Sequence, residues 1–355
     1  MNNKKILYIC GSMNQTTQMH KISQELSEYS AYFTPYYSQG YWYIQALRKI
    51  GLMDFSILGG QAKQNTLNYL KNNNLNIDEE GKQNDYDLVF TCSDMLLPRN
   101  VRDKKIILVQ EGMTDPENLG FKLVKYFSLP RWVGSTSTTG MSNEYEIFCV
   151  ASEGYKDLFI SKGADPEKIV VTGLPNFDNC AQYLKNDFPY KEYVLVATSD
   201  MRETYKYENR KKFIERVVKI AGGKQIIFKL HPNENYERAV REINKFAPGS
   251  LVFQKDKIDP MIANCDILIT RFSSVVYVGL ALGKQVYSEF DLQELKRLLP
   301  LQNGGASAKN IANLARKTMD ETSRSSVFLI NEKPTISQKI LNKIKTSRRL
   351  ARLRN

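Results

Sequence analysis

Short apolar runs alternate with longer polar, amphipathic segments along most of the 355 residues, and this alternation restricts the fold more than any other feature. A short apolar run followed by a segment with helical spacing is the pattern of a βα unit, which builds parallel sheets. The runs form two series, at 6–10, 54–58, 87–91, 106–110, 147–151 and 169–172, and then at 194–198, 225–230, 251–253, 267–270 and 285–288. We therefore expect an α/β protein with two Rossmann-like, doubly wound parallel sheets.

A segment rich in turn-forming residues, 173–190, separates the two series. We expect an N-terminal domain at 1–178, a linker at 179–191, a C-terminal domain at 192–330 and a basic helix at 331–355. Ligands of open parallel sheets bind beyond the carboxyl ends of the strands. Two such domains facing a cleft would place a ligand between them, so the residues that follow each strand are the candidates for chemistry.

The positive charge of the chain is concentrated at one end. Fifty Lys and Arg against 38 Asp and Glu give a net charge of +12. Seven of the basic residues and no acidic ones fall in 337–355, where Ile336, Ile340, Leu341 and Ile344 have helical spacing. Such a basic amphipathic helix can bind an anionic membrane surface, or it can dock on the protein with its charges in solvent.

No stretch approaches the roughly 20 apolar residues of a membrane-spanning helix, and the N-terminus lacks the pattern of a signal peptide. We expect a cytoplasmic protein, peripheral at the inner face of the membrane if the C-terminal helix binds lipid. The cysteines are widely spaced and should be reduced core residues. They are Cys10, Cys92, Cys149, Cys180 and Cys265.

A strand-like run ends in His231-Pro232. Proline has no N–H for the sheet ladder and ends the strand, which leaves His231 at the carboxyl end of the sheet. There the imidazole can donate a hydrogen bond to a phosphate as negative charge grows on a leaving group. A capping histidine without a catalytic role is the alternative.

The run 267–270 is followed by Arg271 and by Ser273-Ser274, which we expect to open a helix that closes at Gly283. A helix start with serine hydroxyls is a ready phosphate cradle, although one serine can merely cap the helix. Lys229, Arg202 and Arg271 are second-rank candidates for phosphate contacts.

The run 106–110 is followed by Glu111-Gly112. Glu111 is placed to act as a general base from the other domain, and Gly112 would let the backbone turn that side chain into the cleft. A surface glutamate at a strand end is the alternative. Gln110, and Gly11-Ser12 after the first run, are weaker candidates for an acceptor pocket.

Other patterns point away from metal or dinucleotide chemistry. Asp85-Tyr86-Asp87 resembles a D-x-D metal motif but begins a strand instead of ending one, so we assign it to structure. The glycine patterns of dinucleotide and P-loop sites are absent, and two histidines make a histidine-based metal cage improbable. The aromatic segment 29–43 suits sugar stacking or a membrane interface, or is a helix start packed on the core.

Together, Glu111-Gly112, His231-Pro232 and Ser273-Ser274 resemble motifs of GT-B glycosyltransferases with cytidine-nucleotide donors. Bacterial polysialyltransferases, capsule Kdo transferases and CDP-glycerol glycerophosphotransferases look similar at these positions. The resemblance implies that His231, Pro232, Ser273 and Ser274 hold the donor phosphate. The polysialyltransferase motif has two acidic residues before the glycine; here Gln110 replaces one of them, so only Glu111 can inherit the role of base.

A second resemblance covers 150–178, which looks like the stretch that leads into the interdomain linker of UDP-N-acetylglucosamine 2-epimerases and lipid A disaccharide synthases. Both resemblances imply a GT-B fold. The histidine and acidic motifs of the epimerases are missing from this chain.

We therefore expect a metal-independent GT-B glycosyltransferase without a cofactor, acting in bacterial surface polysaccharide synthesis. Its donor would be a nucleotide-sugar, preferably a CMP-sugar such as CMP-sialic acid or CMP-Kdo, and its acceptor a glycan or glycolipid. A UDP-sugar transferase or an epimerase-like enzyme is the nearest alternative. A non-catalytic carbohydrate-binding protein also stays open, whereas nucleic-acid binding is disfavoured because aromatic residues do not interleave with the basic ones in a recognisable module.

Overall fold

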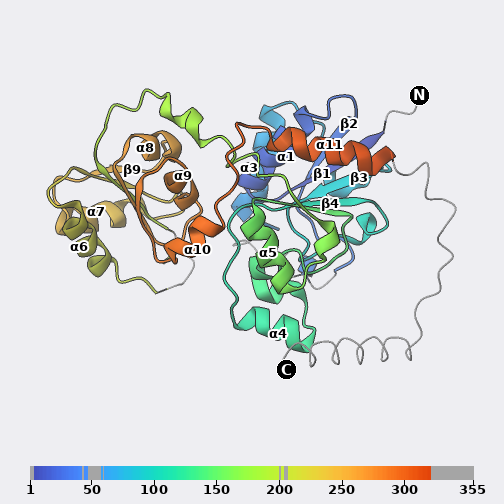
Figure 1. The fold of residues 1–355 in the computed structure, drawn as a ribbon, viewed down its shortest axis with the longest axis horizontal. Helices are drawn as coiled ribbons and strands as arrows, with labels where there is room; N and C mark the ends of the chain where they lie inside the picture. Colours follow the sequence, from blue (N-terminus) through green and yellow to red (C-terminus); the bar gives the residue numbers. More distant parts are fainter. Residues whose placement is uncertain are drawn as a thin grey trace. The chain divides into compact units, whose positions relative to one another are not determined.

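A computed structural model describes residues 4–41, 44–46, 57–58, 60–199, 201–203 and 207–320. Its first sheet contains six parallel strands in the order β2-β1-β3-β4-β5-β6 (Figure 1). They are β1 (Lys5–Cys10), β2 (Ser30–Pro35), β3 (Leu88–Thr91), β4 (Ile106–Val109), β5 (Ile147–Val150) and β6 (Ile169–Val171). The predicted α/β class is confirmed.

The second sheet contains five parallel strands in the order β11-β10-β7-β8-β9. They are β7 (Val194–Ala197), β8 (Ile226–Lys229), β9 (Leu251–Phe253), β10 (Ile267–Thr270) and β11 (Gln285–Tyr287). The strand order reverses between β7 and β10, as it does between β1 and β3 in the first sheet. In doubly wound folds ligands bind beside such reversal points, beyond the carboxyl ends of the strands.

Helices connect the strands, as the alternation in the sequence predicts (Figure 1). They are α1 (Met13–Gln24), α3 (Gly60–Asn72), α4 (Leu119–Phe127), α5 (Glu153–Lys162), α6 (Arg210–Ala221), α7 (Tyr236–Phe246), α8 (Ile258–Asn264), α9 (Val276–Ala281), α10 (Leu292–Arg297) and α11 (Ser307–Asp320). Figure 1 shows α6 and α7 on one side of the second sheet and α8 and α9 on the other. This arrangement follows from right-handed crossovers between parallel strands.

The strands form the cores because they are apolar on both faces. Every residue of β3, β4, β7, β8 and β10 is buried, as expected for parallel strands covered by helices. In the first sheet Tyr8 stacks between Phe33 and Phe90, with ring centroids 5.0 and 5.1 Å apart. In the second sheet Phe228 packs with Ile214 and other apolar residues of a buried cluster. These rigid cores fix where the strands end, and hence where the candidate site residues lie.

One predicted strand falls mostly outside the described residues. Of the strand expected at 54–58, residues 54–56 lie outside them and 57–58 lie in a turn, whereas β2 is a strand that we did not predict. The aromatic segment 29–43 contributes β2, so the helix start, one of the alternatives for this segment, is wrong at 30–35. Because β2 is an edge strand, its first half is only half-buried, and its sequence lacks the apolar run of the central strands.

After α10 the chain returns to the first sheet. The N–H of Leu301 donates to the carbonyl of Ala151 at 3.0 Å, and that of Ser307 donates to Asp178 Oδ2 at 2.9 Å. Arg316 Nε reaches Glu28 Oε1 at 2.6 Å. The second domain predicted at 192–330 thus includes a segment, 301–316, that contacts the first, whereas the other domain limits stay predictions.

All five cysteines are free and buried, as predicted. Within the described ranges no helix is long and apolar enough to cross a membrane. The predicted basic helix at 331–355 lies outside the described residues.

Candidate functional site

The carboxylate of Glu111 is held in place by the start of α1. Glu111 follows β4, and its Oε1 accepts from Ser12 Oγ at 2.5 Å while its Oε2 accepts from Gln15 Nε2 at 2.6 Å. The Asn14 side chain donates to the Glu111 carbonyl at 2.8 Å. Ser12 is also the N-cap of α1, so one hydroxyl orients both the helix start and the carboxylate. The glutamate is half-buried and its oxygens have a defined direction.

The residues beside Glu111 support this loop. Gln110 is buried, and its side chain donates to the Gly112 carbonyl at 2.7 Å and accepts from the Ala151 N–H at 2.9 Å, so it ties β4 to β5. A Cβ at Gly11 would lie 2.2 Å from Gln15 Oε1, so glycine permits that close approach. Gly112 has no left-handed backbone conformation and its Cβ would meet ordinary contacts of 3.5 Å or more. The predicted conformational role of Gly112 is therefore wrong.

His231 lies just beyond β8, as predicted, and its backbone is fixed by a buried network. Its N–H donates to Glu234 Oε2 at 3.0 Å and lies 3.2 Å from Thr198 Oγ1. The Asn233 N–H donates to Nδ1 of the ring at 3.3 Å. Because Nδ1 accepts, the neutral ring carries its proton on Nε2. Pro232 beside it is exposed.

Two buried hydroxyls that we did not predict lie at the reversal point of the second sheet. Ser199 follows β7 and Thr270 ends the neighbouring β10. Among the described residues, neither Ser199 Oγ nor Thr270 Oγ1 has a hydrogen-bond partner. A buried hydroxyl without a partner costs free energy unless a ligand or water satisfies it. The available signal was a Ser or Thr at the end of an apolar run, or just after it.

Ser273 and Ser274 lie in a turn before α9 and do not open the helix as predicted. The helix begins at Val276, its N-cap is Val275, and no side chain caps it. The Ser273 and Ser274 carbonyls accept backbone N–H groups at 3.3 and 3.1 Å. The expected serine cap is therefore wrong, although both side chains remain half-exposed beyond the carboxyl end of β10.

Lys229, predicted as a phosphate contact, donates its hydrogen bonds to backbone carbonyls of the protein. Its Nζ donates to the carbonyls of Gln254 at 2.7 Å and Leu230 at 3.0 Å, and burial lowers its pKa. These bonds tie the end of β8 to the segment after β9. Lys229 thus shapes the sheet edge on which His231 lies.

Arg202 and Arg271 belong to a network of arginines and carboxylates. Arg202 makes two parallel bonds to Glu242, at 2.8 and 2.9 Å, which raise the pKa of the guanidinium. Arg202, Arg210 and Arg271 all lie within 3.4 Å of the buried Glu208 carboxylate. A phosphate bound here would compete with these carboxylates for the guanidinium groups.

Arg271 also lines an open groove of about 300 Å³ together with Lys212 and Arg216. Glu289 lies in the same groove, 3.3 Å from Arg216. Because Arg271 pairs with Glu208 and Arg216 with Glu289, Lys212 leaves the groove one positive charge in excess, which suits an anionic ligand. Lys212 and Arg216 could not be singled out in advance, because α6 has the pattern of an ordinary amphipathic helix.

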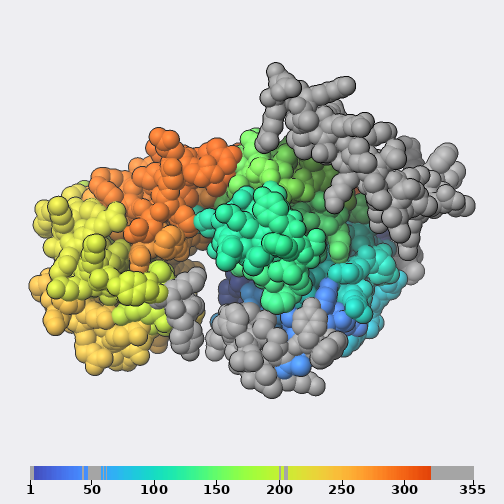
Figure 2. Space-filling view, turned by 90° about the horizontal axis from the view of Figure 1, so that it is seen from below, coloured from blue at the N-terminus to red at the C-terminus, as the bar shows by residue number. Residues whose placement is uncertain are grey.

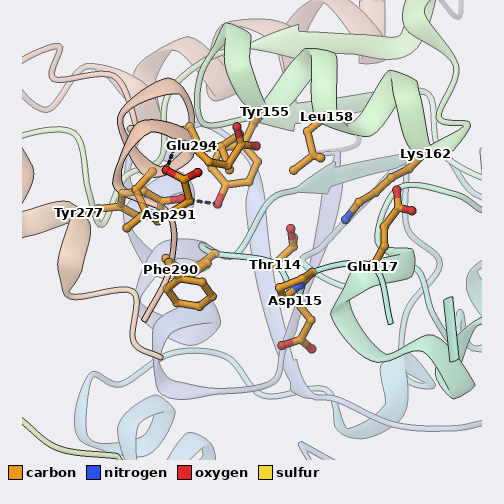
Figure 3. A pocket seen from close by; sticks show the side chains of 14 residues that line it. Thr114, Asp115, Glu117, Tyr155, Leu158, Lys162, Tyr277, Phe290, Asp291 and Glu294 are labelled. Atoms are coloured by element: carbon orange, nitrogen blue, oxygen red, sulfur yellow. Dashed lines mark hydrogen bonds between the residues drawn. The ribbon is translucent and has the colours of Figure 1, made fainter. Parts of the chain in front are cut away.

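A cavity of about 330 Å³ lies beside the Glu111 loop (Figure 3). Aromatic and aliphatic side chains line more than half of it, and four carboxylates line the rest together with Thr114 and Lys162. The hydroxyls of Tyr155 and Tyr277 are 2.8 Å apart in its wall. The side chain of Lys162 is almost wholly buried and points into the cavity, and burial lowers its pKa. Neither Glu111 nor His231 lines this cavity, so the structure does not unite the predicted catalytic residues in one pocket. Met113 and Thr114 line it and also line a smaller cavity that includes Glu111.

Asp85, Tyr86 and Asp87 have structural partners, in agreement with their assignment. Asp85 pairs with Lys104 at 2.7 Å, and Asp87 accepts the Lys5 N–H at 2.8 Å. In the part of the chain that the structure describes, no group of three or more His, Cys, Asp or Glu side chains could hold a metal ion. Metal independence of the reaction remains a prediction.

Comparisons with known proteins support the architecture. No protein-family model and no curated protein matches the chain. Among solved structures, the UDP-N-acetylglucosamine 2-epimerase from Rickettsia bellii is 13% identical with a TM-score of 0.54, covering 92% of this chain and 99% of its own. A variant of the wall teichoic acid polymerase TagF is 12% identical with a TM-score of 0.53, covering 90% of each chain.

The UDP-N-acetylglucosamine 2-epimerase from Neisseria meningitidis, solved with UDP-N-acetylglucosamine bound, is 12% identical. Its TM-score is 0.52, and the match covers 88% of this chain and all of its own. At such identities the likeness shows the fold alone. The chain has the GT-B arrangement of two Rossmann-like sheets.

Proposed function

We propose that the protein is a GT-B glycosyltransferase that moves a sugar from a nucleotide-sugar to a glycan or glycolipid acceptor. The observation that carries the proposal is the Glu111 carboxylate, oriented by Ser12 and Gln15 at the carboxyl end of the first sheet. Hydrogen-bond donors lie at the matching end of the second sheet, namely His231 Nε2 and the hydroxyls of Ser199 and Thr270. A base in one domain and phosphate-binding donors in the other suit glycosyl transfer.

In the proposed reaction Glu111 removes the proton of an acceptor hydroxyl as the oxygen attacks the sugar. The bond between the sugar carbon and the phosphate oxygen breaks, and the nucleotide leaves with the electron pair. The His231 ring N–H, together with Ser273, Ser274 and the two buried hydroxyls, stabilises the negative charge on the departing phosphate. Fixed donors of this kind replace a metal ion.

The 330 Å³ cavity is a suitable acceptor site because it adjoins the Glu111 loop through Met113 and Thr114. Aromatic rings can stack on sugar rings or contact a lipid chain, and Lys162 can donate to an oxygen of the acceptor. A glycolipid acceptor would agree with peripheral membrane binding through 337–355. Synthesis of a surface polysaccharide such as a capsule is the process that this chemistry serves.

Cytidine-nucleotide sugars are the preferred donors, because the Glu-Gly, His-Pro and Ser-Ser pairs resemble motifs of glycosyltransferases that use such donors. A UDP-sugar transferase or epimerase-like enzyme is the second candidate, since UDP-N-acetylglucosamine 2-epimerases share the fold.

A donor screen tests the proposal. The purified chain is mixed separately with CMP-sialic acid, CMP-Kdo, CDP-glycerol and UDP-N-acetylglucosamine, with a pool of short glycans and lipid-linked sugars as acceptors. We expect nucleotide release above the hydrolysis background with one cytidine donor, and release that depends on acceptor. Epimerised UDP-sugar without transfer would favour the second candidate, and no turnover with any donor would contradict the proposal.

A further inference from the structure

A short hairpin on the first-sheet side of the chain carries exposed aromatic residues. It consists of α4, a loop at 128–130 and the 3-10 segment Arg131–Thr138. Leu119, Tyr126 and Phe127 are each at least 70% exposed. Leu129 and Trp132 are exposed as well, and we call these five residues the hairpin patch. Single exposed apolar residues are normal, but five within 14 positions are a concentrated apolar surface.

The patch is built on a preformed element. Phe121 and Val124 anchor one face of α4 in the core, while Leu119 and Tyr126, seven residues apart, share the opposite face. The Asn118 side chain caps the helix at 2.9 Å from the Phe121 N–H. A Cβ at Gly120 would lie 2.4 Å from the Val133 carbonyl, so the two arms of the hairpin are in backbone contact. In Figure 1 α4 lies at the bottom, and in Figure 2 this segment, coloured turquoise to green, faces the viewer.

The charge of the hairpin indicates which kind of partner binds the hairpin patch. Residues 118–143 contain Lys122, Lys125 and Arg131 and no Asp or Glu; Asp115 bonds to Thr136 from just before the hairpin, and Arg131 lies 3.7 Å from Glu144 just after it. Lys122 and Lys125 are exposed beside the aromatic residues. Tyr and Trp with flanking lysines are the residues of a membrane interface, where rings enter the headgroup layer and ammonium groups meet anionic lipids.

The same charge argues against other occupants. A second copy of the chain docked patch to patch would oppose Lys122 and Lys125 with their own copies. The basic segment 337–355 would be repelled in the same way.

We propose that the hairpin patch inserts into the headgroup region of an anionic lipid bilayer. The hairpin patch lies in a different part of the sequence from the basic segment 337–355, and its binding to lipid does not depend on the proposed activity. It would bring the Glu111 loop, which runs directly into α4, toward the membrane surface.

Tryptophan fluorescence of the full chain tests insertion directly. The chain has two tryptophans, Trp42 and Trp132, so Trp42→Phe leaves Trp132 as the single reporter. The vesicles contain phosphatidylcholine and phosphatidylglycerol at about 70:30, so that their surface is anionic. On these vesicles we expect the emission maximum of Trp132 to shift to the blue, and brominated acyl chains to quench its fluorescence. Pure phosphatidylcholine should give little change. An unshifted Trp132 on vesicles that bind the protein, as expected for attachment through 337–355 alone, would overturn the proposal.

Vesicle co-sedimentation of paired variants provides the second test. Tyr126→Ser combined with Phe127→Ser should weaken binding by about tenfold or more, since two rings lose their contact with lipid. Leu184→Ser combined with Tyr236→Ser removes two exposed apolar side chains elsewhere and should bind like wild type. Equal binding by both pairs, or a wild-type dimer that Tyr126→Ser and Phe127→Ser dissociate in the absence of lipid, would refute membrane docking. If the patch variant failed to fold, the Trp132 measurement would still decide.

Discussion

Replacing Glu111 with glutamine is expected to lower kcat by about 10²- to 10⁴-fold, the usual contribution of a positioned general base. Glutamine keeps the size of the side chain but cannot accept the proton of an acceptor hydroxyl. The glutamine carbonyl can still accept from Ser12 Oγ, and its amide can donate to Gln15 Oε1 once the Gln15 amide turns over, so nucleotide binding should stay close to that of the wild type. Steady-state kinetics with the donor found in the screen, together with calorimetric titration of its nucleotide, measure the two effects separately.

Glu146→Gln is the matched control, because Glu146 is an exposed carboxylate at the amino end of β5, away from the proposed site. It should keep wild-type activity. Wild-type kcat in Glu111→Gln would show that Glu111 is not the base. A parallel loss of activity and thermal stability would instead assign its carboxylate to holding α1.

Replacing His231 with alanine should reduce kcat by about 10²- to 10³-fold, as is typical when one electrostatic donor to a developing charge is removed. The backbone N–H and carbonyl of His231 carry its bonds to Thr198 and Glu234, so the loop should keep its conformation although the Asn233 N–H loses its bond to the ring. His231→Gln retains a side-chain N–H at similar reach and should recover part of the activity. The measurement is kcat for each variant with the same donor.

His20→Ala serves as the control, because His20 is the other histidine of the chain and bonds to Tyr69 from the middle of α1. Turnover of His231→Ala within a few-fold of wild type would remove His231 from the mechanism.

Much of the fold was predictable because central parallel strands are uninterrupted apolar runs. The limits of β4, β5, β8 and β10 lie within about two residues of the predicted runs, as is usual for such signals. The edge strand β2 was missed, because its half-exposed sequence lacks that signal. The return of 301–316 to the first sheet depends on contacts more than a hundred positions apart, which a local pattern does not encode.

For the candidate site, the sequence predicted which residues follow the strands but not the hydrogen-bond partners of their side chains. Glu111 and His231 follow strands as predicted, yet the bonds of Glu111 to Ser12 and Gln15 span nearly a hundred residues. The sequence also could not show that Lys229 turns back to two backbone carbonyls. Ser199 and Thr270 were missed because single hydroxyl residues are common, and only the order of the strands makes their position informative.

Calorimetric titration of CMP, CDP, UMP, UDP and GDP tests most directly whether the second sheet binds a nucleotide. We expect CMP or CDP to bind, and Thr270→Val, which keeps the shape but removes the hydroxyl, to weaken binding about three- to tenfold, the range for one lost hydrogen bond. Tight binding of UDP without CMP would move the donor to the uridine class. No binding of any of the five nucleotides would contradict the proposed function.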